Sequence, residues 1–404
     1  MFLFFFCYFC SKTASMKIAI LTSGVLPVPA IQGGAVENLV DMYIAYNDRF
    51  RLHDVTVYSI APPTVAPQKD GATTHYAFIR GNSLKAKLWK TSSRLLRRKF
   101  FYHDSIEYYL HEALRQIRKE RYDLIVVENR PGYALTLSRQ CIVPCVLHLH
   151  NDFLYPGADH VEEICRAFQC IISVSDYITG RVNKVCADKK KCITVHNAID
   201  VGTFHTATPI SRSEIGLADD DFVLVYSGRL IAEKGIMELI QAMNKLQHIP
   251  NLKLLIIGAG AYGNNQSPTP FTKQLRQEAE ILEGDIVFTG FIDYKDVPSY
   301  LKLADVAVLP SMWEEPFGLT VLESMAAGLP LITTHSGGIP EICTGVATIV
   351  ERDSIVENLV NAITDLYEHP QKRKEMAQAS LKRSMLFDKN TYAQSFFDAL
   401  QDLC

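Results

Sequence analysis

Apolar runs of strand length alternate with helical patterns along nearly the whole of this 404-residue chain. The runs are rich in valine and isoleucine and show little polar alternation, as expected for parallel strands covered on both faces. In the first half we expect strands at 17–22, 54–59, 123–127, 145–149, 170–174 and 192–195. The alternation predicts βαβ units and a parallel sheet.

The same pattern starts again after Asp200. Here we expect strands at 222–227, 252–257, 286–289, 306–309, 330–333 and 346–350, and helices near 235–247, 271–282, 297–303, 319–327 and 354–368. Two such blocks predict an α/β protein of two Rossmann-like, doubly wound domains facing across a cleft. The expected join is a turn-rich linker near 197–205. A final helical stretch at about 389–403 has no following strand, and we expect it to pack back across the cleft.

Composition limits the classes of partner. Hydrophobic residues make up 48% of the chain and charged residues 21%, which suits large buried cores. The 41 basic and 44 acidic residues give a net charge of −3, so charge offers no global case for nucleic-acid binding. The ten cysteines are scattered and lie mostly in apolar runs, which favours reduced, buried thiols in a cytosolic protein over disulfides.

The extreme N-terminus is apolar but lacks a basic start, a cleavage site and the length to span a bilayer. The sequence from Met16 is more typical of a first buried strand. We therefore expect residues 1–15 to be an upstream extension or a mis-assigned start. No other stretch reaches transmembrane length.

The segment 310–328 carries the strongest chemical pattern. A strand is expected to end at its start and a helix to begin near Gly318, at the carboxyl edge of a sheet, where ligands bind in open α/β folds. Gly318 lets a ligand approach the backbone, and the free N–H groups of 317–320 form an anion site suited to phosphate. Glu315 and Glu323 offer carboxylates suited to sugar hydroxyls. An isolated pair of glutamates with this spacing would more often cap and solvate a helix.

Two cations follow the strand expected at 222–227. Arg229 can bind a pyrophosphate bidentately and Lys234 can act as a point charge beside it. Taken alone, these residues fit a solvated, salt-bridged loop better. Gly33 and Gly34, after the first strand, offer a backbone cradle, although glycine pairs in turns are weak indicators.

Five motifs stand in a fixed order: Gly33-Gly34, Val195-His-Asn-Ala-Ile-Asp200, Ser227-Gly-Arg-Leu-Ile-Ala-Glu-Lys-Gly235, Glu315 to Glu323, and Ser336-Gly-Gly-Ile-Pro-Glu341. The ordered set resembles the family 4 retaining glycosyltransferases, which have the GT-B fold. Ala198 stands where the family usually has glycine. The resemblance covers nearly the whole chain from Met16.

The resemblance implies transfer of a hexose or N-acetylhexosamine from a nucleotide-sugar, most often a UDP-sugar, to a glycan or glycolipid acceptor with retention of configuration. It implies an acceptor domain at 16–200, a donor domain at 201–385 and a C-terminal helix at 386–404. A lipopolysaccharide or other envelope polysaccharide is the expected product.

The resemblance also assigns roles. Arg229 and Lys234 would neutralise the leaving diphosphate, while Glu315 and His150 would orient the transferred sugar. The expected donor-binding residues are Gly33, Gly34, Gly258, Gly260, Phe317, Gly318, Leu319 and Glu323. Such enzymes position the leaving group with cations and amides, so we expect no metal and no other cofactor.

Three patterns admit rival interpretations. His148 and His150 end a strand and could bind a metal or be one core and one surface histidine. The glycines at 258, 260 and 263 form G-x-G-x-x-G, but the loop that follows them argues against a dinucleotide site. Asp219 to Asp221 contains D-x-D, which fits a solvated turn better than a metal site.

Residues 84–99 carry seven basic and no acidic side chains. Leu84, Leu88 and Leu95 fall close to one helical face, and Trp89 is nearby. This pattern suits a membrane-surface helix attracted to anionic lipid and, about equally, a solvated helix covering the first sheet. We expect a cytoplasmic protein with peripheral contact on the cytoplasmic membrane face.

Two rival functions remain open. One is a different GT-B chemistry, such as a sugar-nucleotide epimerase, and the other is a non-catalytic nucleotide- or carbohydrate-binding homologue. The intact Arg229, Lys234, Glu315 and Glu323 argue against the second.

Overall fold

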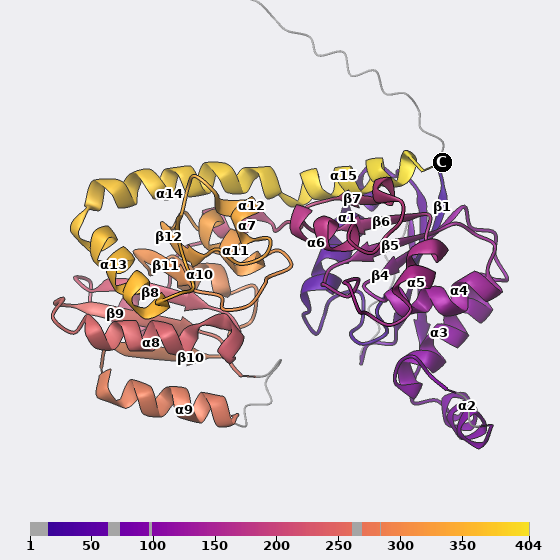
Figure 1. Cartoon of the computed structure of the whole chain (residues 1–404), viewed down its shortest axis with the longest axis horizontal. Coiled ribbons are helices and arrows are strands. Elements are labelled where there is room, and N and C mark those ends of the chain that lie inside the picture. Colours follow the sequence, from indigo (N-terminus) through magenta and orange to yellow (C-terminus); the bar gives the residue numbers. More distant parts are fainter. Residues whose placement is uncertain (1–14, 64–72, 97–98, 261–268, 283, 404) are drawn as a thin grey trace, which may run out of the picture. The chain divides into compact units, whose positions relative to one another are not determined.

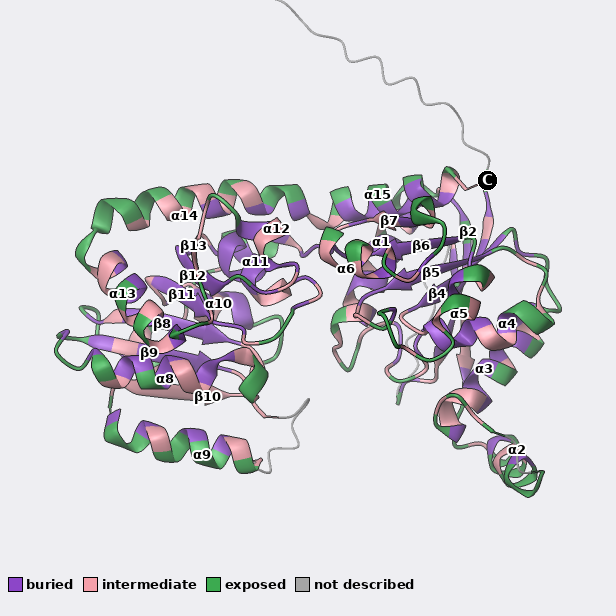
Figure 2. Cartoon of the chain, viewed as in Figure 1, coloured by how far each residue is buried: buried purple, intermediate pink, exposed green. Residues whose placement is uncertain are grey.

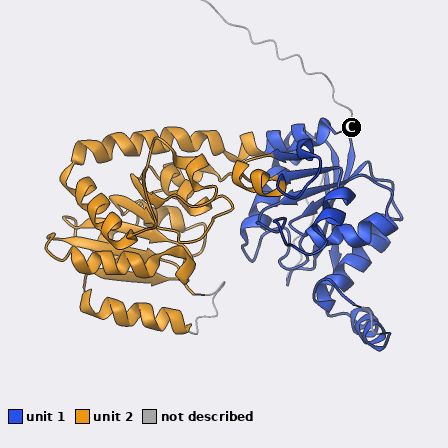
Figure 3. Cartoon of the chain, viewed as in Figure 1, with its two compact units in different colours: residues 1–172, 183–193, 393–404 blue, residues 173–182, 194–392 orange. Residues whose placement is uncertain are grey.

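The computed structural model describes residues 15–63, 73–96, 99–260, 269–282 and 284–403. The proposed N-terminal extension, apart from Ser15, and Gly263 of the glycine-rich turn lie outside these residues. The chain forms two compact units, shown in Figure 3. Residues 1–172, 183–193 and 393–404 make up the first unit, and residues 173–182 and 194–392 make up the second. The domain limits predicted at 200 and 385 remain predictions.

The first sheet has seven strands among the described residues, in the order β3-β2-β1-β4-β5-β6-β7. The neighbouring strands from β3 to β5 pair in parallel, and β1 lies between β2 and β4. The strands are β1 (Lys17–Leu21), β2 (Asp54–Ile60), β3 (Thr74–Ile79), β4 (Leu124–Glu128), β5 (Cys145–Leu149), β6 (Cys170–Ser173) and β7 (Cys192–Thr194). Every residue of β4 and β5 is buried, which accounts for their uninterrupted apolar sequences (Figure 2).

Helices follow these strands, as the alternation predicts. Apolar side chains such as Leu39 and Ile44 form the buried stripe of the first helix. The helices of this half of the chain are α1 (Ala35–Phe50), α2 (Leu84–Leu95), α3 (Asp104–Ile117), α4 (Ala134–Gln140), α5 (Val161–Ala167) and α6 (Asp176–Val182). Of these, α6 belongs to the second unit.

The second sheet has six described strands in the order β10-β9-β8-β11-β12-β13, all paired in parallel. They are β8 (Phe222–Ser227), β9 (Leu252–Ile257), β10 (Ile286–Gly290), β11 (Val306–Leu309), β12 (Leu331–Thr334) and β13 (Thr348–Val350). The helices are α7 (Val201–Thr206), α8 (Ile236–Lys245), α9 (Pro270–Ala279), α10 (Val297–Leu301), α11 (Leu319–Ala326), α12 (Ile339–Cys343), α13 (Ile355–Glu368) and α14 (Pro370–Ser384). Figure 1 shows α8 and α9 on one side of the sheet and α11, α12 and α14 on the other.

The last helix, α15 (Lys389–Gln401), returns the chain to the first unit, to which residues 393–404 belong. Phe396 stacks on Tyr43 of α1 with ring centroids 4.2 Å apart, and Phe397 lies 5.2 Å from the ring of His53. These two aromatic side chains are almost fully buried and anchor the helix. That this helix packs across a cleft stays a prediction.

The predicted fold class is confirmed: each unit carries a parallel sheet of the Rossmann-like type. None of the described helices combines the length and the apolar character needed to cross a membrane. The seven cysteines that the structure describes are all free thiols, and six of them are buried.

Candidate active site

The strand–turn–helix predicted around Gly318 is present in the second unit. β11 ends at Leu309, α11 begins at Leu319, and Gly318 stands at the N-cap with φ 114°. Within the described part of the chain, no hydrogen bond uses the backbone N–H groups of Phe317, Gly318 or Leu319. These donors, at the positive end of the α11 helix, are therefore available to an anion.

Lys234 and Glu315 form an ion pair at this helix start. The Lys234 ammonium lies 2.5 Å from Oε1 of Glu315, and the hydroxyl of Ser311 donates to the same oxygen at 2.8 Å. The side chains are only 20% and 9% exposed, so each charge depends on the other for compensation. Sequence reasoning missed Ser311, because a serine near a strand end carries no distinctive signal.

Gly235 explains how Lys234 reaches this position. Its φ is 69°, and a Cβ atom built on it would lie 1.9 Å from the carbonyl oxygen of Pro310. The turn after β8 and the loop after β11 therefore pack backbone against backbone, which only glycine allows. This contact places the lysine beside the glutamate although 81 positions separate them in the sequence.

A small cavity lies between these two loops. The residues that line it include Lys234, Ser311, Glu315, Gly318 and Thr320. The structure thus brings together a cation, a carboxylate and the helix start that the sequence predicts as site residues. Arg229 is not among the described residues that line this cavity. It lies in the turn after β8, where its carbonyl oxygen accepts a hydrogen bond from Tyr226 at 2.9 Å.

Glu323 lies one turn further along α11 and is 6% exposed. Burial raises the pKa of this carboxyl to about 7, and a hydrogen bond from Tyr294 opposes the shift. Near neutral pH the side chain therefore exists both as a carboxylate and as an acid. Tyr294 had no distinctive sequence pattern.

Gly258 and Gly260 follow β9. A Cβ on Gly258 would lie 1.9 Å from the carbonyl oxygen of Gly228, so this glycine is required for the approach of two turns. Gly260 lies against the side chains of Thr269 and Thr272. Residues 261–268, which complete the predicted glycine-rich turn, lie outside the described residues.

His150 belongs to the first unit, at the end of β5. Its Nε2 lies 3.0 Å from Oε2 of Glu128, and His148 Nδ1 lies 3.1 Å from the same oxygen. The hydroxyl of Tyr43 donates to Oε1 of Glu128 at 2.8 Å. Sequence reasoning missed Glu128, although it is the one ionisable residue in an otherwise apolar strand and pairs in register with His148.

Two of these buried groups, Glu128 and His150, have shifted pKa values. Burial alone would raise the pKa of Glu128, but the charge and hydrogen bonds of His148 and His150 outweigh it and lower that pKa to about 2. Burial lowers the pKa of His150 to about 4, so its imidazole is neutral at pH 7. A neutral ring bonded through Nε2–H to Glu128 presents Nδ1 as an acceptor.

Two groups of described residues have ligand atoms close enough to share a metal ion: Glu128, His148 and His150, and Asp176, His196 and Glu341. Hydrogen bonds within each group already account for its geometry. The expectation that the protein needs no metal remains a prediction.

Gly33 and Gly34 precede α1 in the first unit, with φ values of 74° and 107°. A Cβ on Gly34 would lie 2.2 Å from Oε2 of Glu37, whereas Gly33 has open space around it. Gly34 is therefore explained by packing, and Gly33 leaves room for a ligand near the backbone.

Comparisons with known proteins agree with this fold. Residues 33–203 match the family model "Glycosyltransferase Family 4", and residues 208–383 match "Glycosyl transferases group 1". With two such domains and the fold described above, the chain is a glycosyltransferase of the GT-B type.

One relative matches most of the chain, and another matches about half of it. Spore coat protein SA of Bacillus subtilis (strain 168) is 29% identical over 386 residues, 91% of this chain and 94% of that protein. Lipopolysaccharide 1,2-N-acetylglucosaminetransferase of Salmonella typhimurium is 27% identical over 201 residues, 47% of this chain and 51% of that protein. The crystal structure of Anabaena Alr3699/HepE in complex with UDP and glucose is similar with a TM-score of 0.70 and 21% identity, covering 95% of this chain and 99% of that one.

Proposed function

We propose that the protein transfers a hexose or N-acetylhexosamine from a UDP-sugar to a glycan or glycolipid acceptor, with retention of anomeric configuration. The observation that carries the proposal is the Lys234–Glu315 pair beside the unbonded N–H groups of Phe317 to Leu319. A cation and several amides that converge on one cavity suit a diphosphate. The similar Anabaena protein was solved with UDP and glucose, which supports UDP as the nucleotide.

In this proposal the enzyme acts mainly on the leaving group. As the bond between the sugar and the diphosphate oxygen breaks, negative charge grows on the diphosphate, and Lys234, Arg229 and the amides of 317–319 stabilise it. The departing phosphate accepts the proton of the attacking acceptor hydroxyl, so no separate protein base is required. Glu315 holds the ammonium in place and faces the sugar, and Glu323 accepts hydrogen bonds from the ribose.

We place the acceptor on the first unit and assign His150 a contact with the transferred sugar through Nδ1. The proposed acceptor belongs to an envelope polysaccharide or lipopolysaccharide. The name of the Salmonella relative, a lipopolysaccharide transferase, supports this class of acceptor. The proposed place of action is the cytoplasm, at the membrane face.

A screen of nucleotide-sugars tests the donor. A ligand at about 100 times its Kd adds about 2.7 kcal/mol to the free energy of unfolding. UDP-sugars should therefore raise the Tm of the protein clearly above the rise given by GDP-, ADP- or CMP-sugars, and one UDP-sugar should be slowly hydrolysed. Stabilisation by GDP-sugars alone would show that the donor carries GDP and that the proposed UDP is wrong. An epimerised sugar-nucleotide as the product would instead establish the epimerase, and binding without any turnover would favour the non-catalytic homologue.

The exposed face of α2 supports the proposed membrane contact. Leu84, Leu88 and Leu95 share one face of the helix and are 73%, 63% and 78% exposed. Figure 2 shows that much of α2 is exposed. Trp89 points the other way, because its ring lies 5.7 Å from that of Tyr108 on α3. The tryptophan thus anchors the helix to the unit and is not part of the exposed leucine stripe. An outward apolar stripe on a basic helix is typical of interfacial binding.

The change Leu84→Asp with Leu88→Asp tests this contact. The wild-type protein should pellet with vesicles rich in phosphatidylglycerol and not with phosphatidylcholine alone, and the double variant should lose most of that binding. Ile142→Asp is a matched control, since Ile142 is a fully exposed apolar residue of the same unit and should not affect pelleting. Equal pelleting of the double variant and the wild type would contradict the proposal.

A further inference from the structure

Ser175 belongs to the segment 173–182, which follows β6 in sequence but forms part of the second unit. Its side chain is fully buried. The hydroxyl donates to the carbonyl oxygen of Pro316 at 2.6 Å and accepts from the N–H of Ile178 at 3.1 Å. The hydroxyl therefore acts as a donor on one side and as an acceptor on the other, and these two bonds fix the direction of its O–H group.

The bond to Pro316 determines where the next amide points. In a trans peptide the C=O and N–H groups point in opposite directions. Because the Pro316 carbonyl points at Ser175, the N–H of Phe317 points away from it. That N–H is one of those with no acceptor in the described chain. Donation to the carbonyl also polarises the peptide and strengthens its N–H as a donor.

The preceding peptide is held from the same side. The N–H of Gly338 donates to the carbonyl oxygen of Glu315 at 2.8 Å. A Cβ on Gly338 would lie 2.7 Å from the Pro316 oxygen and 3.2 Å from Cβ of Ser175. The absence of a side chain at this position therefore lets Ser175 reach the loop.

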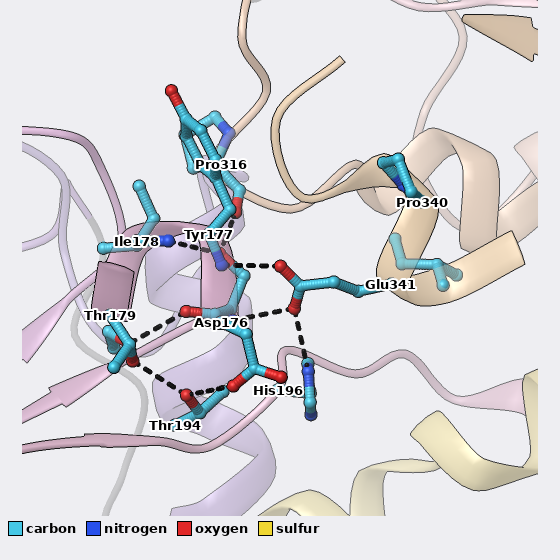
Figure 4. A network of polar contacts seen from close by, with 12 residues as sticks. Asp176, Tyr177, Ile178, Thr179, Thr194, His196, Pro316, Pro340 and Glu341 are labelled. Atoms are coloured by element: carbon cyan, nitrogen blue, oxygen red, sulfur yellow. Dashed lines mark hydrogen bonds and ion pairs between the residues drawn. The ribbon is translucent and has the colours of Figure 1, made fainter. Parts of the chain in front are cut away.

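A polar network holds Ser175 in place, and Figure 4 shows it. The carboxylate of Glu341 accepts from the N–H groups of Asp176 and Tyr177 at 2.7 and 2.6 Å, and lies 3.1 Å from Nε2 of His196. The hydroxyl of Thr194 donates to Asp176 at 2.6 Å. Hydrogen bonds thus join Glu341 to the segment 173–182 behind the loop.

We propose that Ser175 is a positioning residue for the diphosphate of the donor: its hydroxyl holds the Pro316 carbonyl and so aims the Phe317 N–H at the phosphate. Ser175 acts through the loop and has no contact with the substrate. The inference rests on the proposed function, since the diphosphate is the ligand of this amide.

The change Ser175→Ala tests the inference by comparing two ligands. UDP carries the diphosphate and uridine does not, so the variant should bind UDP about tenfold more weakly and uridine, measured by competition, as well as the wild type does. The loss should appear as a raised KM for the UDP-sugar together with a lower kcat. A purely structural defect would weaken both ligands alike.

Ser384→Ala is the matched control. Ser384 belongs to the same unit, is equally buried and donates a hydrogen bond at 2.7 Å, but its acceptor is the carbonyl oxygen of Leu381 and not the loop of Pro316. It should lose comparable stability and keep its UDP affinity. If the alanine variant fails to fold, Ser175→Cys, which keeps a weaker donor, carries the same comparison.

The outcomes separate the two proposals. A wild-type protein that binds neither UDP nor a UDP-sugar would refute the proposed donor. A wild-type protein that binds UDP, with Ser175→Ala binding it unchanged or losing UDP and uridine equally, would overturn the role of Ser175 alone.

Discussion

Replacing Lys234 with methionine should lower turnover by about 10²- to 10³-fold, on the scale seen when one preorganised donor to a developing negative charge is removed. The lysine ammonium is held 2.5 Å from Glu315 at the cavity beside the α11 helix start, so its charge is in place before the diphosphate departs. Steady-state kcat with a UDP-sugar measures the effect. A variant with the wild-type kcat would contradict both the role of Lys234 and the assignment of the site.

Stability must be separated from catalysis in this variant. Removing the ammonium leaves Glu315 as a buried, uncompensated charge, which costs about 3–5 kcal/mol of unfolding free energy when burial is complete. The double variant Lys234→Met with Glu315→Gln removes that charge, so it should recover part of the lost Tm and none of the turnover. Lys245→Ala, which breaks an exposed pair with Glu357, should change neither quantity measurably.

Replacing Gly235 with alanine should strongly destabilise the protein. The new Cβ would lie 1.9 Å from the Pro310 carbonyl oxygen, and the backbone φ of 69° is itself unfavourable for alanine. We expect a loss of about 3 kcal/mol or more, from strain and overpacking together, and a lower kcat because Lys234 precedes this glycine. The urea midpoint and kcat measure the two effects.

Gly328→Ala separates strain from collision. Gly328 has a similar φ of 79° in the same unit, but nothing lies within 4 Å of its Cβ position. This control should lose only about 1 kcal/mol and keep full activity. If the two variants lost the same free energy of unfolding, the close contact between the Gly235 turn and the Pro310 loop would not contribute to the loss.

Most of the fold could be predicted from the sequence, because buried parallel strands leave continuous apolar runs. The described elements that were missed include β3, α7, α12 and α14. α7 (Val201–Thr206) is a short helix within the segment expected to be a turn-rich linker. β3 reads as Thr-His-Tyr-Ala-Phe-Ile, an edge strand with partly exposed residues and little apolar continuity. α14 is dominated by polar residues, and α12 is only a single turn of five residues.

The site was predicted in part. Lys234, Glu315 and Gly318 were expected together, and the structure brings them to one cavity, since each follows a strand of the same sheet edge. Ser311, Tyr294, Glu128 and the contact of Ser175 were not foreseen. Their partners lie far away in sequence, and a single serine or tyrosine has no spacing that would indicate a long-range hydrogen bond.

The two compact units exchange segments in both directions along the chain. Residues 173–182 leave the first half to complete the second unit, and residues 393–404 return from the end to complete the first. A chain divided near residue 200 would therefore yield no faithful copy of either unit. The C-terminal fragment would lack the Ser175 hydroxyl that donates to the carbonyl oxygen of Pro316, and the N-terminal fragment would expose Tyr43 without its covering Phe396. Any fragment or circular permutant of this protein should therefore keep residues 173–182 with the second unit and residues 393–404 with the first. The same holds for segmental labelling.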